Sequence, residues 1–272
     1  MKIEERRTWM NGFDTFTDAD IISFGSESCV VPVLDIYNHW DLFLKILKLD
    51  IRIKIVTPRV SQSEIADVIN LLNKIVTLRR KIDLVVNDWG LFYYSYHNKN
   101  CFNIHIGRQL CRSLIDCPWH QEIMDNEVPS TQRIIKTYPF NGNNAADAGI
   151  FGVELNKVSN DIIFDHFDEK IEIAIHEDDY ILTCGRTCLI KKIYPRKSCY
   201  DICDHKVHID PVGKWLNYFD RNVPMTNYEK ALLSNIALNG KKIVKPQENF
   251  NTIFSKNSKN IVLIKYQKEK RK

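Results

Sequence analysis

The chain has 272 residues, of which 44% are hydrophobic and 26% are charged, and its formal net charge is +4. This balance is typical of a globular protein that buries a sizeable core, and it excludes a largely disordered chain. No uncharged apolar run approaches the roughly 18 to 20 residues that a membrane-spanning helix needs, so we expect a cytoplasmic protein without membrane insertion.

The length fits a single α/β barrel, which typically takes roughly 250 residues. We therefore predict one domain over residues 1–272. The densest run of positive charge is the tail at residues 265–272, KYQKEKRK. Such a tail can contact nucleic acid, but a solvated, frayed terminus is the commoner outcome and is what we expect here.

Strand and helix patterns alternate in the first part of the chain. A helix is predicted at residues 35–49, and a second helix begins at Ser61 and Glu64, which have capping-box spacing. Short β-rich runs flank these helices, and we predict strands at residues 20–25, 51–58 and 82–88. Because the connections are short, the alternation predicts parallel strands joined by right-handed crossovers.

The remainder of the chain contains further β-rich runs and fewer helical patterns. One helix is expected at residues 227–238, and turn-forming residues dominate the stretch 130–148. We predict strands at residues 101–107, 152–156, 170–177, 241–246 and 259–267. Seven or eight strands with fewer helices favour a TIM-barrel-like (β/α) fold over an open doubly wound sheet.

Cysteines provide the strongest chemical signal in the sequence. Cys29 follows the first predicted strand, and four more cysteines lie close together in the sequence, namely Cys184, Cys188, Cys199 and Cys203. The chain has no secretory signal, so we expect these thiols to bind a metal or an iron–sulfur cluster rather than to form disulfides. Cys101, Cys111 and Cys117 lie where a small buried apolar residue would serve equally well.

The four clustered cysteines alone would make a local zinc site that stabilises a non-catalytic scaffold, because the ten residues between the two pairs can form a closing loop. The three-residue spacing within each pair argues against this site, since structural zinc sites commonly use two-residue turns. The alternative recruits Cys29 and three of the four clustered cysteines.

Five segments resemble, in order, motifs of peptidase family U-32, the collagenase-like protease family, and in particular its short iron–sulfur members of the UbiV type. The segments are DADIISFGSESC (residues 18–29), VVNDWGLFYY (85–94), VELN (153–156), IEIAIHEDDYILTCGRTC (171–188) and KSCYDICDH (197–205). The resemblance covers about two thirds of the chain. It implies a TIM-barrel-like fold and a [4Fe-4S] cluster.

Carried over by position, the resemblance implies Cys29, Cys184, Cys199 and Cys203 as the cluster ligands, with Cys188 as an alternative to Cys184. It also implies a part in oxygen-independent hydroxylation, as in ubiquinone biosynthesis, or in a related modification. The substrate would be a small aromatic, quinone-like molecule or an RNA, and a related U-32 subunit would complete a heterodimer.

The sequence departs from the family at its N-terminus, where WMNGFDTF (residues 9–16) stands in place of a recognisable first strand. We therefore expect a distorted or incomplete barrel, or one closed by the C-terminal strands.

No catalytic residue can be assigned from the sequence. Peptidase activity is a further alternative, but the chain has neither an HExxH pair nor a G-x-S-x-G motif. His205 and His208 are the histidines nearest to Cys203, and a role outside catalysis is favoured for them. Four polar candidates lie on or at the end of predicted strands, where they could line a pocket or cap helices: Asp83, Asn87, Asp88 and Glu154. An aromatic run could stack a planar substrate or serve in packing: Trp89, Phe92, Tyr93, Tyr94 and Tyr96. His176, Glu177, Asp178 and Asp179 are expected to form a solvated acidic turn.

Overall fold

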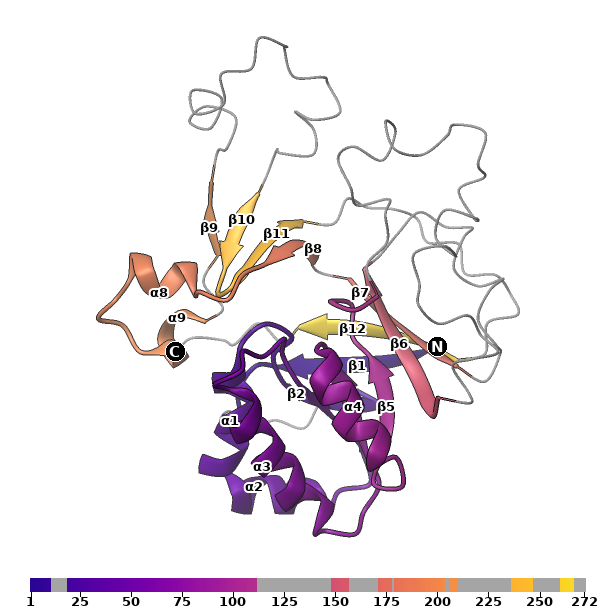
Figure 1. The fold of residues 1–272 in the computed structure, drawn as a ribbon. Helices are drawn as coiled ribbons and strands as arrows, with labels where there is room; N and C mark the ends of the chain where they lie inside the picture. The colour runs from indigo at the N-terminus through magenta and orange to yellow at the C-terminus, as the bar shows by residue number, and fades with distance from the viewer. Residues whose placement is uncertain are drawn as a thin grey trace, which may run out of the picture.

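The computed structural model describes residues 1–10, 19–111, 148–156, 171–177, 179–203, 206–209, 236–246 and 260–266. Its main feature is a closed barrel of parallel strands in the order β1-β12-β7-β6-β5-β4-β3-β2 (Figure 1). The eight strands are β1 (Lys2–Arg7), β2 (Ile21–Gly25), β3 (Arg52–Val56), β4 (Ile82–Val86), β5 (Phe102–Ile106), β6 (Ile150–Asn156), β7 (Glu172–His176) and β12 (Ile261–Tyr266). The predicted TIM-barrel-like fold is confirmed.

The N-terminal segment contains a complete first strand, so the prediction that no recognisable first strand is present was wrong. β1 pairs in parallel with β2 on one side and with β12 on the other. Its sequence, KIEERR, lacks the apolar pattern expected of a buried strand. Its inward-facing residues, Glu4 and Arg6, are charged and pair with each other inside the barrel. The C-terminal strand β12 closes the barrel between β1 and β7, as one of the alternatives had predicted.

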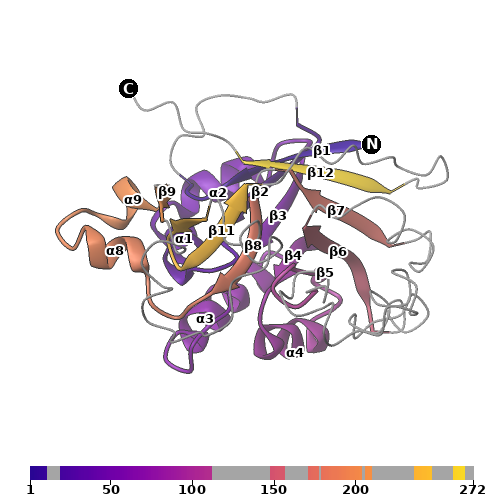
Figure 2. The same cartoon turned by 90° about the horizontal axis from the view of Figure 1, so that it is seen from above.

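Four helices cover the outside of the barrel beside the first five strands (Figures 1 and 2). They are α1 (Val30–Asn38), α2 (Trp40–Ile46), α3 (Ile65–Val76) and α4 (Trp89–His97). The single helix predicted over residues 35–49 is therefore two helices that meet at His39. Outward-facing strand residues such as Ile55 and Leu84 pack with helix residues such as Val33 and Leu72 in one buried core cluster.

A small antiparallel sheet and two short helices are inserted between β7 and β12. The sheet order is β8-β11-β10-β9, with β8 (Asp179–Cys184), β9 (Lys206–His208), β10 (Ala237–Asn239) and β11 (Lys242–Pro246). The short helices are α8 (Leu189–Ile193) and α9 (Cys199–Ile202), which lie on the side to which β1 and β12 point in Figure 1. The insert follows the carboxyl end of β7 and precedes β12, and in barrel enzymes the carboxyl ends of the strands carry the site.

The insert changes two predictions from the sequence. Ala237 and Leu238 belong to β10, so the end of the helix predicted at residues 227–238 was wrong, while residues 227–235 lie outside the described part. The last two predicted strands both exist as β11 and β12, but they belong to different sheets. The irregular stretch at 130–147 and residues 267–272 of the basic tail are also outside the described residues.

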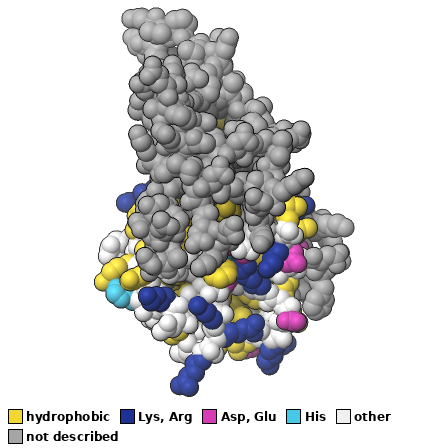
Figure 3. All heavy atoms as spheres, turned by 90° about the vertical axis from the view of Figure 1, so that its right-hand side faces the viewer, with side chains coloured by type: hydrophobic (Ala, Val, Ile, Leu, Met, Phe, Trp, Pro, Cys, Tyr) yellow, Lys and Arg dark blue, Asp and Glu magenta, His cyan; other side chains and the backbone are white. Residues whose placement is uncertain are grey.

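None of the described helices is long and apolar enough to cross a membrane. On the described part of the face drawn in Figure 3, lysine and arginine side chains are scattered among other side chains and form no continuous basic patch.

Candidate functional site

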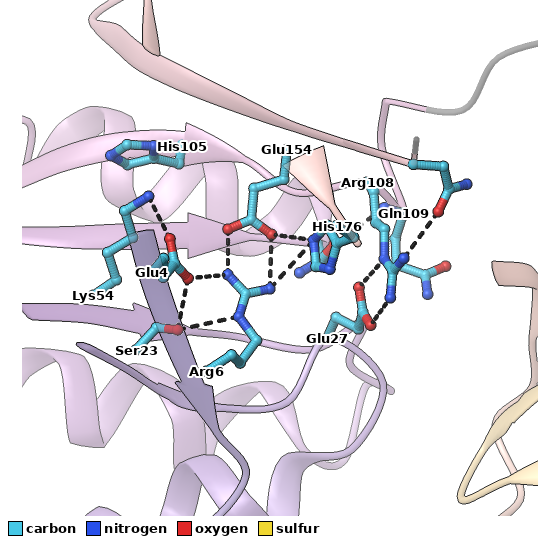
Figure 4. A network of polar contacts seen from close by, with 12 residues as sticks. Glu4, Arg6, Ser23, Glu27, Lys54, His105, Arg108, Gln109, Glu154 and His176 are labelled. Carbon is cyan, nitrogen blue, oxygen red and sulfur yellow. Dashed lines mark hydrogen bonds and ion pairs between the residues drawn. The ribbon is translucent and has the colours of Figure 1, made fainter. Parts of the chain in front are cut away.

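Charged side chains fill the inside of the barrel, where aliphatic side chains are usual. Arg6 of β1 donates through Nη1 to Glu154 of β6 at 2.9 Å, and Lys54 of β3 lies 2.8 Å from both Glu4 of β1 and Glu172 of β7 (Figure 4). These contacts join strands that are not neighbours in the sheet, so they cross the interior. Arg6, Lys54, Glu4 and Glu154 are each at most 1% exposed.

At the carboxyl end of the barrel strands, a cavity of about 560 Å³ lies between the barrel and the small sheet. We call it the mouth cavity. Its barrel side includes Arg6, Glu27, Arg108 and Tyr266. Its other side comes from α8, α9 and the turn between β10 and β11, including Lys191, Ile202 and Lys241. The volume lies in the range of roughly 300 to 1,000 Å³ that is typical of small-molecule sites.

Four thiols line the mouth cavity: Cys29, Cys188, Cys199 and Cys203. Cys29 reaches it because β2 ends at Gly25 and the following loop leads into α1, whose N-cap residue is Cys29. Cys188 is the N-cap residue of α8, and its Sγ accepts from the Lys191 backbone N–H at 3.3 Å. Cys199 begins α9 and Cys203 ends it.

Cys184 lies outside the lining of the mouth cavity. It is the last residue of β8, is 9% exposed, and its Sγ lies 3.7 Å from the carbonyl oxygen of Gly185. It is not among the residues that line the mouth cavity, whereas Cys188, the alternative ligand of the sequence analysis, is. Of the predicted ligands, the fold therefore gathers Cys29, Cys199 and Cys203, with Cys188 as the fourth thiol.

The surroundings of Cys29 shift its ionisation. Burial raises the pKa of the Cys29 thiol, and the nearby Cys188 and Cys199 thiols raise it further, while the Val31 amide and Lys241 oppose the rise. In the metal-free protein this shift favours the protonated thiol over the thiolate.

Positive charge exceeds negative charge on the walls of the mouth cavity. Among the lining residues that the structure describes, the cations are Arg6, Arg108, Lys191, Lys206, Lys241 and Lys242. The lining carboxylates are Glu27, Glu64 and Asp179. An iron–sulfur centre with four thiolate ligands carries net negative charge, so the excess of cations on the walls favours such an anionic group.

Within the described residues, no group of three or more histidine, cysteine or carboxylate side chains is arranged to hold a single metal ion. Four of the described thiols line the walls of the mouth cavity. In a [4Fe-4S] centre each thiolate binds a different iron, so the ligands are spread around the cluster. A single zinc ion would need its sulfur ligands at about 2.3 Å from the metal.

The chain gives no match to any known family model, curated protein or solved structure. Similarity to the U-32 family therefore depends on the sequence motifs alone.

Most of the other candidate residues have structural partners. Asp88 caps α4 by accepting from the Gly90 N–H at 2.8 Å, and Asn87 donates to the Thr57 carbonyl at 2.9 Å. Asp83 pairs with Arg52 near the amino-terminal end of the barrel. Glu154 is one of the interior charges. None of these four candidates lines the mouth cavity.

The expected solvated turn at residues 176–179 was wrong for two of its members. His176 is fully buried inside the barrel, and Asp179 is 9% exposed at the start of β8. Glu177 is half-buried and Asp178 lies outside the described residues. The burial of His176 could not be predicted from the isoleucines that alternate along β7. His176 lies on the other face of the strand, with Glu172 and Ala174, and that face points into the barrel.

The aromatic run forms α4, on which Leu91 is buried while Trp89 and Tyr93 are 49% and 67% exposed. Cys111 is buried in the core cluster, as predicted, and Cys101 packs against the same cluster. Cys117 and His205 lie outside the described residues. His208 is exposed in β9, which is consistent with a role outside catalysis.

Sequence reasoning missed the residues that form the floor of the mouth cavity. Glu27, Arg108, Lys242 and Tyr266 come from four separate segments. A signal did exist for Glu27, because an isolated glutamate stands between two serines in the loop that leads to Cys29. No local pattern marks Arg108 or Tyr266, since their partners are far away in the sequence.

Proposed function

We propose that this protein binds a [4Fe-4S] cluster in the mouth cavity through Cys29, Cys188, Cys199 and Cys203. The observation that carries the proposal is that these four thiols, one remote and three from a single insert, line the same cavity. The Lys191 N–H donated to Cys188 and the surrounding cations would stabilise bound thiolates. A cluster of this kind supplies electron transfer or activation of a bound substrate.

The proposed reaction is an oxygen-independent hydroxylation or a related modification, in keeping with the U-32 resemblance. The barrel fold is one that often carries enzymes, and the volume of the mouth cavity favours a small aromatic, quinone-like molecule over an RNA as the group that enters it. A partner subunit related to the chain would complete the active complex. In this scheme the chain's own residues hold the cluster, exclude water and orient the substrate beside the Tyr266 hydroxyl.

Metal analysis of protein purified and reconstituted without oxygen tests the cluster. We expect about four irons and four sulfides per chain and an absorbance band near 400 nm. Cys29→Ser and Cys188→Ser should each lower the iron content several-fold. Cys184→Ser should keep the iron content of the unmodified protein, and so should Cys101→Ser, a control at a half-buried thiol elsewhere.

Two results would contradict this assignment. Stoichiometric zinc without iron or sulfide would favour the zinc-stabilised scaffold. Loss of iron in Cys184→Ser with full retention in Cys188→Ser would return the fourth position to Cys184.

A further inference from the structure

Glu27 accepts four side-chain hydrogen bonds at the floor of the mouth cavity. Arg108 donates to its two carboxylate oxygens from Nε and Nη2, both at 2.7 Å (Figure 4). Lys242 donates to Oε1 at 3.2 Å and the Tyr266 hydroxyl donates to the same oxygen at 3.1 Å. Glu27 is 2% exposed, so this carboxylate is almost completely removed from water.

The donors to Glu27 belong to different parts of the fold. Arg108 follows β5 and Tyr266 ends β12, so both belong to the barrel, whereas Lys242 begins β11 of the small sheet. Arg108 also donates to Asn156 of β6 at 2.9 Å and to the backbone carbonyl of Asp179, where β8 starts. Glu27 and Arg108 together therefore fasten the small sheet to the barrel.

Glu27 stands two residues before Cys29, in the loop that joins β2 to α1. The small sheet leads directly into the other thiols: β8 is followed by Cys188 at α8, and the Leu189 N–H donates to the Gly240 carbonyl beside β11 at 3.0 Å. One buried carboxylate thus links the loop that carries Cys29 to the small sheet, which is continuous with the helices that carry the other three thiols.

The charge of Glu27 is essential to this link. Arg108 pairs with the Glu27 carboxylate at 2.7 Å and Lys242 lies 3.2 Å from it, so two cations face this buried group. Replacing it with a neutral group leaves Arg108 and Lys242 buried without their counter-charge, which is strongly unfavourable.

We propose that Glu27 is a positioning residue that holds Cys29 opposite Cys188 and Cys199 before any metal is bound. That this positioning serves to bind a cluster rests on the proposed function, but the positioning of Cys29 by Glu27 does not. Docking of the small sheet on Glu27 sets the separation between the remote thiol and the other three. The cluster then enters a site that is already assembled.

Thiol cross-linking in metal-free protein tests this inference. The full-length chain, treated with a chelator and kept reduced, is exposed briefly to dibromobimane, a short reagent that bridges two neighbouring thiols, and the joined peptides are mapped by mass spectrometry. We expect Cys29 to be joined to Cys188 or Cys199 in the unmodified protein. In Glu27→Gln the yield of these pairs should fall at least fivefold.

Glu172→Gln is the matched control. Glu172 is also a buried carboxylate between two cations, Arg52 and Lys54, but it lies near the opposite end of the barrel. This variant should lose stability while keeping the cross-links of the unmodified protein. Equal loss of cross-links in both variants would show a general effect of destabilisation and would overturn the inference, as would full cross-linking in Glu27→Gln.

A second variant keeps the test decisive if Glu27→Gln does not fold. Lys242→Met removes the link from the small sheet and leaves the Glu27–Arg108 pair in place. We expect a two- to threefold loss of the same cross-links, and an unchanged yield would overturn the inference.

Failure of Cys29 to cross-link in the unmodified protein would overturn it as well. Cross-links that depend on Glu27, in a protein that never binds iron, would refute the proposed function alone.

Discussion

His176 is a fully buried imidazole between a carboxylate and a phenol. Its Nε2 lies 3.1 Å from Glu154, and its Nδ1 lies 3.5 Å from the Tyr266 hydroxyl. Burial and the nearby cations Arg108 and Arg6 lower the pKa of His176 to about 4, although the contact with Glu154 opposes the shift. The folded protein therefore keeps this ring neutral under conditions that protonate a free histidine.

The free energy of unfolding should fall as the pH drops from about 6.5 toward 4. In that range the unfolded chain binds a proton at His176 and the folded chain does not, so acid favours unfolding. Between pH 7 and pH 5 this residue accounts for about 2 kcal/mol. His176→Gln should reduce the difference in unfolding free energy between the two pH values by about that amount. Urea denaturation at each pH measures it.

His208→Gln, at an exposed histidine in β9, is the control. An unaltered pH dependence in His176→Gln would contradict the prediction.

At this same scale, the sequence predicted three of the thiols that line the mouth cavity but could not select the fourth. Cys184 and Cys188 are four residues apart, and the choice between them depends on where β8 ends and α8 begins. Cys184 is still paired in the sheet opposite Lys242, whereas the chain has turned toward the mouth cavity by Cys188. That turn is fixed by pairing between β8 and β11, which local sequence does not reveal.

Among the elements, the junction between β2 and α1 determines where Cys29 lies. Gly25 ends β2 with φ +107°, a backbone conformation that favours glycine. A Cβ at this position would lie 2.3 Å from the Val56 carbonyl oxygen and 2.7 Å from Val33 Cγ2. Neighbouring backbone and helix atoms thus leave no room for a side chain where the loop to Cys29 begins.

Gly25→Ala should therefore destabilise the protein by at least about 2 kcal/mol, through backbone strain and the clash with β3. Gly185→Ala is the matched control, because the nearest atom to its added Cβ is 3.8 Å away, and its effect should stay within about 0.5 kcal/mol. Thermal unfolding followed by circular dichroism compares the two. Similar melting temperatures for the two variants would refute the argument.

Periodicity identified the apolar strands and most helices of the first half, because β2 to β5 and α3 have regular apolar patterns. It missed β1, whose inward positions are Glu4 and Arg6, and it could not find the small sheet. Strands β8 and β11 pair across a long stretch of intervening chain, so no local pattern reports that pairing.

Across the whole molecule, paired charges take the place of an apolar barrel interior. The sequence contains the corresponding signal, since the strand RIKIV alternates charged Arg52 and Lys54 with aliphatic residues. Taken alone, such alternation predicts one face in water. Closure of the barrel removes that face from water, and opposite charges from distant strands, such as Glu172, then neutralise it.

Lys54→Met should destabilise the protein by about 3 kcal/mol, because Glu4 and Glu172 each lose one of their two cationic partners in the barrel interior. The exposed pair of Lys265 and Glu177, 3.7 Å apart, provides the comparison. Lys265→Met should change stability by less than about 0.5 kcal/mol. Urea denaturation at neutral pH measures both, and equal effects would show that the interior charges contribute no more than a surface pair.

The filled interior also determines how molecules reach the thiols. Arg6, Lys54, Glu154 and their neighbours plug the lumen, so no passage runs through the barrel axis from the far end. Among the described residues, access to the thiols is therefore from the carboxyl end of the barrel, where α8 and α9 line the mouth cavity. If the proposed cluster is bound there, a protein docked over α8 and α9 would both shield it from oxidation and control which molecules reach it.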